Sequence, residues 1–434
     1  MTPAAPVEHG DIQGNILRGY TLEHAAHLFV TVAEDAGAHA RALLRELLPR
    51  VTTAAPWPRG GRPDGTLNVA LTYPGLAALA PGQALLDAFA PEFRAGMAAR
   101  AGAELGDTGP SAPATWEPGL EDAAVLLTLY SGSPAARDAD AAALAAEVAG
   151  HPGLEVPYLQ RTDGDGEARE HFGFRDGFSQ PAVEGSGRPA RGEGVRGRLG
   201  WRPIRLGEFI LGHRDEDGIV AGAGSEILHN GTYMVWRKLA QDADRFRRWL
   251  EDASGGDPEA AELLAWQVVG RRRDGTSLMR PAQVGPGPAD PDNGFTYAED
   301  PRGLRCPLGA HVRRANPRDA LGWRTERTKR HRIIRRGMAY AGGPDQEAGL
   351  VFVCLNASIE RQFEFIQGQW LGDGGTFGLG DDRDFLLGEG DPEAKMTIQG
   401  ARPRFLTPGQ RFVTTRGGHY LFVPGMAALD RLAA

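Results

Sequence analysis

Cysteine is nearly absent from this chain of 434 residues, which contains only Cys306 and Cys354. The two cysteines form no Cys-x-x-Cys pair, no zinc-ligand spacing and no Cys-x-x-Cys-His motif. Zinc ribbons and a covalently attached c-type haem are therefore excluded, because both require such spacings. Any haem in this protein must be held without covalent bonds.

Long hydrophobic runs are also missing. No stretch reaches about 18 uninterrupted apolar residues, the length that a membrane-spanning helix requires. The first ten residues, 1–10, contain no basic patch, twin arginine or apolar run of the kind found in export signals. We therefore expect a cytoplasmic protein with no membrane partner.

The chain has no excess of positive charge, since 48 Lys and Arg face 56 Asp and Glu and the net charge is −8. This balance argues against a nucleic-acid partner, which favours a basic surface. Two short basic clusters, at residues 271–273 and 327–330, are more typical of solvated faces. With 41% hydrophobic and 24% charged residues the composition is that of a globular protein, and the length predicts two to three domains.

The first half of the chain predicts a β-α-β-β-α-β order. A helix after the first strand carries four leucines on one face, and an Ala-rich helix precedes the last strand. An insertion containing Phe93 and Met97 separates the middle strands. This order is that of the ferredoxin-like unit. The strands are expected at residues 27–33, 67–72, 124–130 and 155–160, and the helices at residues 43–48 and 134–148.

The second half repeats this order, so the predicted class is α+β, with two ferredoxin-like domains and antiparallel sheets. Residues 412–415 and 420–423 are expected to form a hairpin around Gly417 and Gly418, because tight turns favour glycine. We place the domains at residues 1–185 and 186–434. The other elements are strands at residues 231–236, 332–337 and 350–355, a helix at 241–251, and a helix with the apolar stripe Ile359, Phe363, Ile366 and Trp370.

Four polar, glycine-rich segments are predicted to join these elements. One of them contains a formal Gly-x-Gly-x-x-Gly pattern at residues 192–197. No strand precedes this pattern and no apolar helix follows it, so a loop is favoured over a dinucleotide site. The joining segments are residues 161–169, 185–200, 285–293 and 372–384.

An acid flanked by glycine, Asp176 in Gly173-Phe174-Arg175-Asp176-Gly177, is the first candidate functional residue. An Asp-Gly pair is most often a turn, but glycine also lets the backbone approach a flat ligand closely. A functional role requires a nearby cation. Arg335 and Arg336 lie on a predicted strand, where alternation points them to opposite faces, so that one must face inward.

His311 is the second candidate. An isolated histidine is usually a hydrogen-bonded structural residue, but Arg313 and Arg314 follow it closely. A haem iron takes its axial nitrogen from such an imidazole, and the carboxylates of haem suit the bidentate fork of arginine. His171 and His419 are rival ligands with poorer neighbours.

Taken together, these motifs resemble the dye-decolorising peroxidase family, whose signature is Gly-x-x-Asp-Gly with a histidine far downstream. The resemblance implies paired ferredoxin-like domains of the dimeric α+β barrel-like superfamily, with one non-covalent haem b. Residues 339–341, Ala-Tyr-Ala, depart from the Pro and Gly usual there in the family. The similar segments are residues 11–17, 173–181, 207–212, 231–239, 350–356 and 361–365.

The resemblance also implies a role for each residue. His311 would be the iron ligand, Asp176 the distal acid–base group and Arg335 the distal arginine. Asp384 would accept the other ring N–H of His311, with Asp381 and Asp382 as close competitors. The residues expected to contact the cofactor are His311, Arg313, Arg314, Gly177, Ser179, Gln180, Phe352, Leu355 and Asp384.

The implied function is a peroxidase that reduces hydrogen peroxide and oxidises a bulky aromatic or dye-like reductant in one-electron steps. Self-association is left open. One alternative is a haem-handling protein or a biosynthetic haem oxidase with little peroxidase turnover, and another is a haem-free interaction protein. The Asp176–Arg335 pair argues against a plain carrier, which needs neither group.

Overall fold

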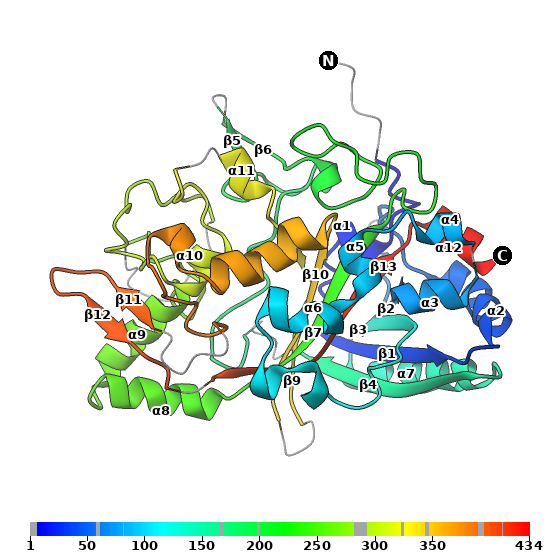
Figure 1. Cartoon of the computed structure of the whole chain (residues 1–434), viewed down its shortest axis with the longest axis horizontal. Helices are drawn as coiled ribbons and strands as arrows, with labels where there is room; N and C mark the ends of the chain where they lie inside the picture. The colour runs from blue at the N-terminus through cyan, green and yellow to red at the C-terminus, as the bar shows by residue number, and fades with distance from the viewer. Residues whose placement is uncertain are drawn as a thin grey trace.

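The computed structural model describes residues 7–57, 61–80, 82–164, 166, 169–197, 200–281, 293–322, 325–342, 347–388, 395–409 and 411–434. Of the predicted joining segment 285–293, all but Asn293 lies outside these ranges. Within the described residues, nine strands form one sheet, in the order β4-β1-β3-β2-β13-β7-β10-β8 with β9 paired to β10. Figure 1 shows most of the first half of the chain on the right, together with the C-terminal end, and most of the second half on the left.

The N-terminal half contains the predicted ferredoxin-like order, with strands in the spatial sequence β4-β1-β3-β2 and antiparallel pairing throughout. Helix α7 begins where the sequence indicates, because the Ser133 hydroxyl accepts a hydrogen bond from the Ala136 N–H and Pro134 opens the helix. The elements are β1 (His24–Val32), α2 (Gly37–Leu47), β2 (Gly65–Leu71), β3 (Val125–Ser131), α7 (Pro134–Ala149) and β4 (Leu154–Asp163).

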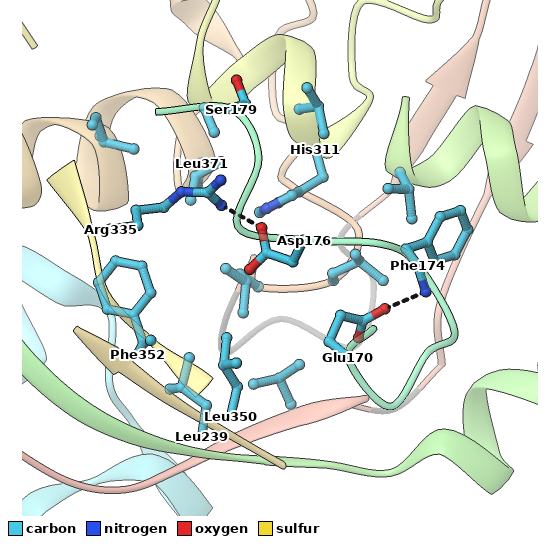
Figure 2. A pocket seen from close by; sticks show the side chains of 18 of the residues that line it. Glu170, Phe174, Asp176, Ser179, Leu239, His311, Arg335, Leu350, Phe352 and Leu371 are labelled. Atoms are coloured by element: carbon cyan, nitrogen blue, oxygen red, sulfur yellow. Dashed lines mark hydrogen bonds and ion pairs between the residues drawn. The ribbon is translucent and has the colours of Figure 1, made fainter. Parts of the chain in front are cut away.

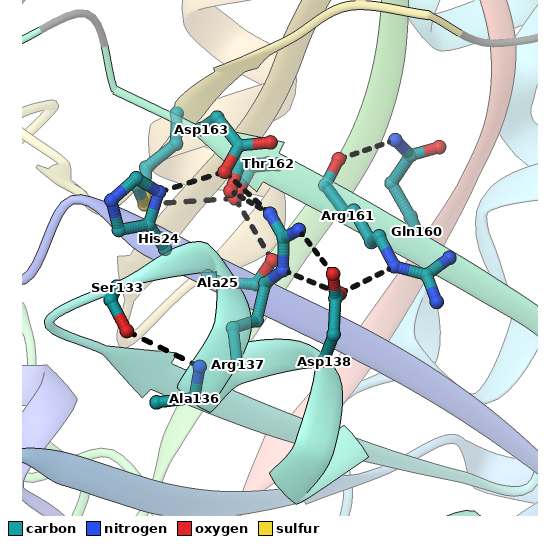
Figure 3. A network of polar contacts seen from close by, with 11 residues as sticks. His24, Ala25, Ser133, Ala136, Arg137, Asp138, Gln160, Arg161, Thr162 and Asp163 are labelled. Atoms are coloured by element: carbon teal, nitrogen blue, oxygen red, sulfur yellow. Dashed lines mark hydrogen bonds and ion pairs between the residues drawn. The ribbon is translucent and has the colours of Figure 1, made fainter. Parts of the chain in front are cut away.

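The outer edge of this half, at β4, carries a network of charged side chains (Figure 3). Arg137 on α7 pairs with Asp138 and Asp163, and Asp163 also pairs with His24 on β1 at 2.7 Å. Arg161 on β4 pairs with Asp138 at 2.8 Å. These ion pairs fasten the start of α7 to the sheet, and charges at an edge strand discourage pairing with other chains.

The C-terminal half repeats the arrangement as β13-β7-β10-β8, again antiparallel. The two halves join where β13 pairs with β2, at Phe422 and Leu71. The predicted α+β fold with two ferredoxin-like units is therefore confirmed. The elements are β7 (Thr232–Gln241), α8 (Ala243–Ala253), α9 (Pro258–Val269), α10 (His311–Ala315), β8 (Ile334–Arg335), β9 (Met338–Tyr340), β10 (Gly349–Asn356), η6 (Ile359–Leu371) and β13 (Val413–Val423).

The predicted hairpin around Gly417 and Gly418 is wrong. Residues 413–423 form the single strand β13, which has a bulge between Thr415 and Gly417. A Cβ atom on Gly417 would lie 2.3 Å from a Leu120 methyl carbon, and one on Gly418 would lie 2.4 Å from the Met97 sulfur. The two glycines therefore serve close packing against the N-terminal half, where no side chain fits, rather than a turn.

The helix predicted from the apolar stripe is present as η6, but it is a π-helix. Its last turn shows the wider winding, because the Gly372 N–H donates to the Gln367 carbonyl at 3.0 Å. Ile359, Phe363 and Trp370 are buried, as expected. Such helices are rare and often lie at functional sites.

The insertion between β2 and β3 reaches across to the C-terminal half. Arg100 on α6 makes a bidentate ion pair with Glu364 on η6, and Asp107 pairs with Arg237 on β7. The N-terminal half thus holds parts of the second unit in place. The insertion consists of α3 (Tyr73–Ala78), α4 (Gln83–Leu86), α5 (Pro91–Ala95), α6 (Met97–Leu105), η2 (Gly109–Ser111) and η3 (Pro113–Thr115).

The remaining elements are short and surround the two units. The terminal helix α12 packs against α2 in the N-terminal half, as Figure 1 shows at the right. The boundary between residues 185 and 186 therefore stays a prediction. These elements are α1 (Gly14–Leu17), η1 (Leu48–Arg50), β5 (Val195–Gly197), β6 (Gly200–Arg202), η4 (Leu206–Glu208), α11 (Thr325–Lys329), η7 (Gly375–Phe377), β11 (Met396–Ile398), β12 (Arg404–Leu406) and α12 (Met426–Ala433).

Alternation along β7 separates two environments. Met234 and Trp236 pack into an apolar cluster that also contains Phe29 of the first half. The other face carries Arg237, Leu239 and Gln241, which line a cavity. Strand periodicity thus sets the position of the candidate site on the outer face of the second unit. No helix among the described residues is long and apolar enough to cross a membrane.

Candidate active site

A cavity of about 280 Å³ lies between the face of β7, β10 and β13 that carries Arg237 and Phe352, helix η6, and the segments that carry Asp176 and His311. Figure 2 shows Asp176, Arg335 and His311 directed toward one another inside it. Most of its wall is hydrophobic, which suits a flat, largely apolar ligand. The apolar lining residues are Phe172, Phe174, Phe178, Leu239, Val269, Val312, Ala315, Ile333, Leu350, Phe352, Phe363, Ile366, Leu371, Leu386, Leu387 and Val413.

Asp176 and Arg335 form an ion pair inside this cavity, with 2.9 Å between Arg335 Nη1 and Asp176 Oδ1. Arg335 lies on β8, and its backbone N–H donates to Gln180 Oε1 at 2.9 Å, which ties the Asp176 segment to the strand. Arg336 points the other way and donates to the carbonyls of Asn15 and Ile16. Arg335 is therefore the inward arginine.

The environment of Asp176 favours the carboxylate form. Burial by itself raises the pKa of Asp176, but the Arg335 charge and the Gly177 N–H outweigh burial and hold this pKa below its ordinary value. Gly177 adopts φ of +80°, which glycine reaches at little cost. The turn and the ion pair together fix an ionised acid in the cavity.

His311 opens helix α10 and lies on the same cavity, where its Nδ1 is 3.0 Å from Asp384 Oδ2. Asp384 is almost fully buried and also accepts hydrogen bonds from the N–H groups of Leu386 and Leu387. Burial by itself lowers the pKa of His311, but the Asp384 carboxylate outweighs it and raises that pKa overall. The contact leaves Nε2 as the ring nitrogen available to the cavity.

The other residues considered for the roles of Asp384 and His311 have different partners. Asp381 pairs with Lys395 at 2.5 Å, and Asp382 accepts from the Thr397 N–H at 2.7 Å. His171 Nε2 contacts the Tyr340 carbonyl and His419 Nε2 the Leu120 carbonyl, and neither ring lines the cavity. The geometry therefore pairs Asp384 with His311.

The expected contact between the cofactor and Arg313 and Arg314 stays a prediction, and both side chains have other partners in this structure. Both arginines are buried outside the cavity lining. Arg313 pairs with Asp300 at 3.0 Å, and Arg314 donates to the carbonyl of Trp370 at 2.6 Å at the end of η6. Their function is to brace the backbone around α10 and to cap η6, since a cation satisfies the free carbonyls at a helix end.

Of the other residues expected to contact the cofactor, some line the cavity and some do not. Ser179 and Phe352 line the cavity, whereas Gly177, Gln180 and Leu355 do not. Gln180 instead holds the backbone, through Arg335 and the Gly177 carbonyl. Leu355 alternates to the opposite face of β10, where it joins the apolar cluster between the halves.

Sequence reasoning missed a group of buried cations at one end of the cavity. Arg271 and Arg332 line it, and Lys329 and Arg318 lie beside Arg332, all four at most 6% exposed. Arg332 Nη2 pairs with Glu193 at 2.7 Å, but Nη1 has no hydrogen-bond partner among the described residues. The predicted solvated faces at residues 271–273 and 327–330 are thus wrong for Arg271 and Lys329.

Known proteins resemble this chain over most of its length. Residues 212–377 match the family model described as Dyp-type peroxidase, C-terminal. A dye-decolorizing peroxidase of Mycetinis scorodonius is 29% identical over 96% of this chain and 86% of its own. The solved structure of an ancestral D-type dye decolorizing peroxidase has a TM-score of 0.84 and 28% identity, covering 99% of this chain and 100% of its own.

The chain is similar to dye-decolorising peroxidases over most of its length. A multifunctional dye peroxidase of an Amycolatopsis species is also similar, at 31% identity over 63% of each chain. The prediction of a dye-decolorising-type peroxidase, an oxidoreductase, is thereby confirmed. The departure at residues 339–341 is accommodated in this chain, because β9 pairs with β10 and buried Tyr340 donates to Glu347 at 3.0 Å.

Dye-decolorising peroxidases depend on haem, and the residues of the cavity fit that group. The wall is apolar, one imidazole nitrogen is free to face the cavity, and the unpartnered Nη1 of Arg332 is a buried donor suited to a carboxylate. No cluster of three or more His, Cys, Asp or Glu side chains that would suit a bare metal ion occurs in the described part of the chain.

Proposed function

We propose that this chain is a haem b peroxidase that reduces hydrogen peroxide and oxidises bulky aromatic or dye-like reductants in one-electron steps. The observation that carries the proposal is the Asp176–Arg335 ion pair, which shares a cavity with the Asp384-bound His311. When bound, the haem supplies a redox-active iron that transfers oxidising equivalents from peroxide to the reductant.

His311 would hold the iron through Nε2. Asp384 supports this role, because a carboxylate on the other ring nitrogen fixes the tautomer and raises the donor strength of the imidazole. Arg332, with Arg271 beside it, would receive the carboxylates of the haem in place of Arg313 and Arg314. The free Nη1 of Arg332 and the buried positive charge around it support this assignment.

Asp176 would move the proton. Cleavage of the O–O bond of hydrogen peroxide requires that a proton leave one oxygen and reach the other, which is general acid–base work. The depressed pKa of Asp176 keeps the carboxylate ready to accept that proton. Arg335 would stabilise the negative charge that develops on the departing oxygen.

The second candidate, a haem-handling protein with little turnover, receives less support. A carrier requires a ligand such as His311 and cations for the haem carboxylates. It does not require an ionised acid held by an arginine at 2.9 Å inside the same cavity. This pair favours the peroxidase.

The test is a comparison of the wild-type protein with Asp176→Asn. We expect the wild type to show the absorption of haem, to release the haem into acid-acetone, and to turn over peroxide with a generic aromatic reductant. Asp176→Asn should retain the haem and lose most of the turnover. Haem with equal, slow turnover in both proteins would favour the haem-handling alternative, and absence of haem from the wild type would refute both.

A further inference from the structure

Glu170 is a second carboxylate on the cavity wall, in the segment that leads to Asp176 (Figure 2). Its Oε1 accepts the Phe174 N–H at 2.8 Å. Its Oε2 accepts the Phe172 N–H at 2.8 Å and the side-chain amide of Gln241, on β7, at 2.8 Å. Three neutral donors thus hold both oxygens of Glu170.

The backbone of the same segment closes on itself. The Glu170 N–H donates to the Phe174 carbonyl at 3.1 Å, and the Gly173 N–H donates to the Glu170 carbonyl at 2.8 Å. Gly173 has φ of +88°, and a Cβ atom there would lie 2.7 Å from the Arg273 guanidinium. The chain therefore folds tightly around the Glu170 carboxylate and emerges two residues before Asp176.

We infer that Glu170 is a positioning residue, whose carboxylate fixes the backbone of residues 172–174 and thereby directs Asp176 at Arg335. The inference rests on the proposed peroxidase function, which gives Asp176 its role. Gln241 connects Glu170 to β7. The sheet that forms part of the cavity wall therefore also helps to fix the position of Asp176 in the cavity.

The hydrogen bonds of Glu170 indicate that its carboxylate has a structural role and does not transfer protons. The carboxylate accepts hydrogen bonds from two buried backbone N–H groups, which would otherwise have no partner. Burial raises the pKa of Glu170 and the Asp176 charge adds to this, while the two N–H groups and Gln241 oppose it. The pKa of Glu170 is raised overall, so its positioning role rests on the three donors that occupy both carboxylate oxygens.

The substitution Glu170→Gln tests the inference at constant side-chain size. The amide keeps one acceptor oxygen but presents an NH₂ group to the second backbone N–H, so the segment should loosen. We expect faster hydrogen exchange at Phe172 and Phe174, and reaction with peroxide about 10- to 100-fold slower per bound haem, since small misplacements of catalytic groups cost this much. Haem content and the KM for the reductant should not change.

Glu216→Gln is the matched control. The Glu216 side chain is 2% exposed, pairs with Arg202 and accepts the Arg205 N–H at 2.9 Å, but it does not line the cavity. This variant should react with peroxide like the wild type. If Glu170→Gln does not fold, Gln241→Met removes the third donor to Glu170 and should slow the reaction in the same direction.

The inference is overturned if Glu170→Gln, loaded with haem, reacts with peroxide at the wild-type rate. It is equally overturned if the variant loses haem or melts early while the rate per haem stays unchanged, because that result describes a stability role alone. A wild-type protein without haem or peroxide reaction would refute the proposed function instead. In that case, hydrogen exchange at Phe172 and Phe174 that is the same in Glu170→Gln as in the wild type would still show that Glu170 does not hold this backbone in place.

Discussion

Arg335 Nη1 lies 2.9 Å from Asp176 Oδ1, and the two side chains come from opposite halves of the sequence. The pair is partly open to the cavity, with about one third of each side chain exposed. An exposed ion pair contributes little to stability. A charged pair kept at the wall of an apolar cavity is better explained by chemistry at that wall.

The first prediction concerns the two arginines on and next to β8. Asp176→Asn and Arg335→Leu should each retain haem and slow the reaction with peroxide by at least tenfold, because they remove the proton acceptor and the charge that assists it. Stopped-flow mixing with peroxide measures these rates. Arg336→Leu is the control. Its guanidinium serves the carbonyls of Asn15 and Ile16, so stability should fall while the rate per haem is retained.

The second prediction is a shift in pH dependence. Arg335 holds the pKa of Asp176 below its ordinary value, so the wild-type reaction should decline only at acid pH, as the carboxylate becomes protonated. In Arg335→Leu the Arg335 charge no longer opposes burial, although the Gly177 N–H still does, and the pKa of Asp176 should rise. The acid limb of the rate constant against pH should therefore move to higher pH. An unmoved acid limb would show that another group controls the reaction.

The third prediction identifies the ligand of the iron. His311→Ala should lose most of its haem, because Nε2 of this residue is the nitrogen that the cavity offers. Asp384→Asn should retain haem with a changed absorption spectrum, since the hydrogen bond to Nδ1 tunes the ligand. His171→Ala should behave like the wild type. Normal haem content in His311→Ala would contradict the assignment.

The fourth prediction separates the two sets of arginines. Arg332→Ala should weaken haem binding, measured by transfer of haem to an acceptor such as apomyoglobin, because it removes the free buried donor beside the cavity. Arg313→Ala should instead lower the melting temperature, since it leaves Asp300 buried without its partner. Weaker haem binding in Arg313→Ala, with unchanged haem binding in Arg332→Ala, would instead indicate that Arg313 contacts the cofactor.

The fifth prediction concerns Glu193, which pairs with Arg332 among buried cations. Burial alone raises the pKa of Glu193, but Arg332, Arg318 and Lys329 outweigh burial and lower it to about 2. The resulting stabilisation is present above the ordinary pKa and is lost as the pH falls toward 2. Glu193→Gln should lower the free energy of unfolding by about 3–5 kcal/mol at pH 7.

Urea titrations of wild-type and Glu193→Gln proteins at pH 7 and pH 3 check this prediction. The difference in free energy of unfolding between the two proteins should be smaller at pH 3, because the Glu193 carboxyl of the unfolded wild-type chain then binds a proton while that of the folded protein stays mostly ionised. A difference that does not depend on pH would mean that the lost contact is steric rather than electrostatic.

Local patterns in the sequence determined the two ferredoxin-like units. A run such as residues 124–130 or 350–355 is apolar at nearly every position, because the strand is covered on both faces. The turn at Asp176 could also be predicted, because an Asp-Gly pair is most often a turn. These features depend on neighbours in the chain and therefore leave a local signal.

The tertiary structure alone decided which charges face the cavity. Arg313, Arg314 and Arg332 cannot be distinguished by residue type, but of the three only Arg332 lines the cavity. Arg313 pairs with Asp300, and Arg314 donates to a carbonyl at the end of η6. Gly417 and Gly418 predicted a turn, although they lie in a strand that the N-terminal half presses against. Partners of this kind are distant in the chain, so their energies enter only once the two halves have packed together.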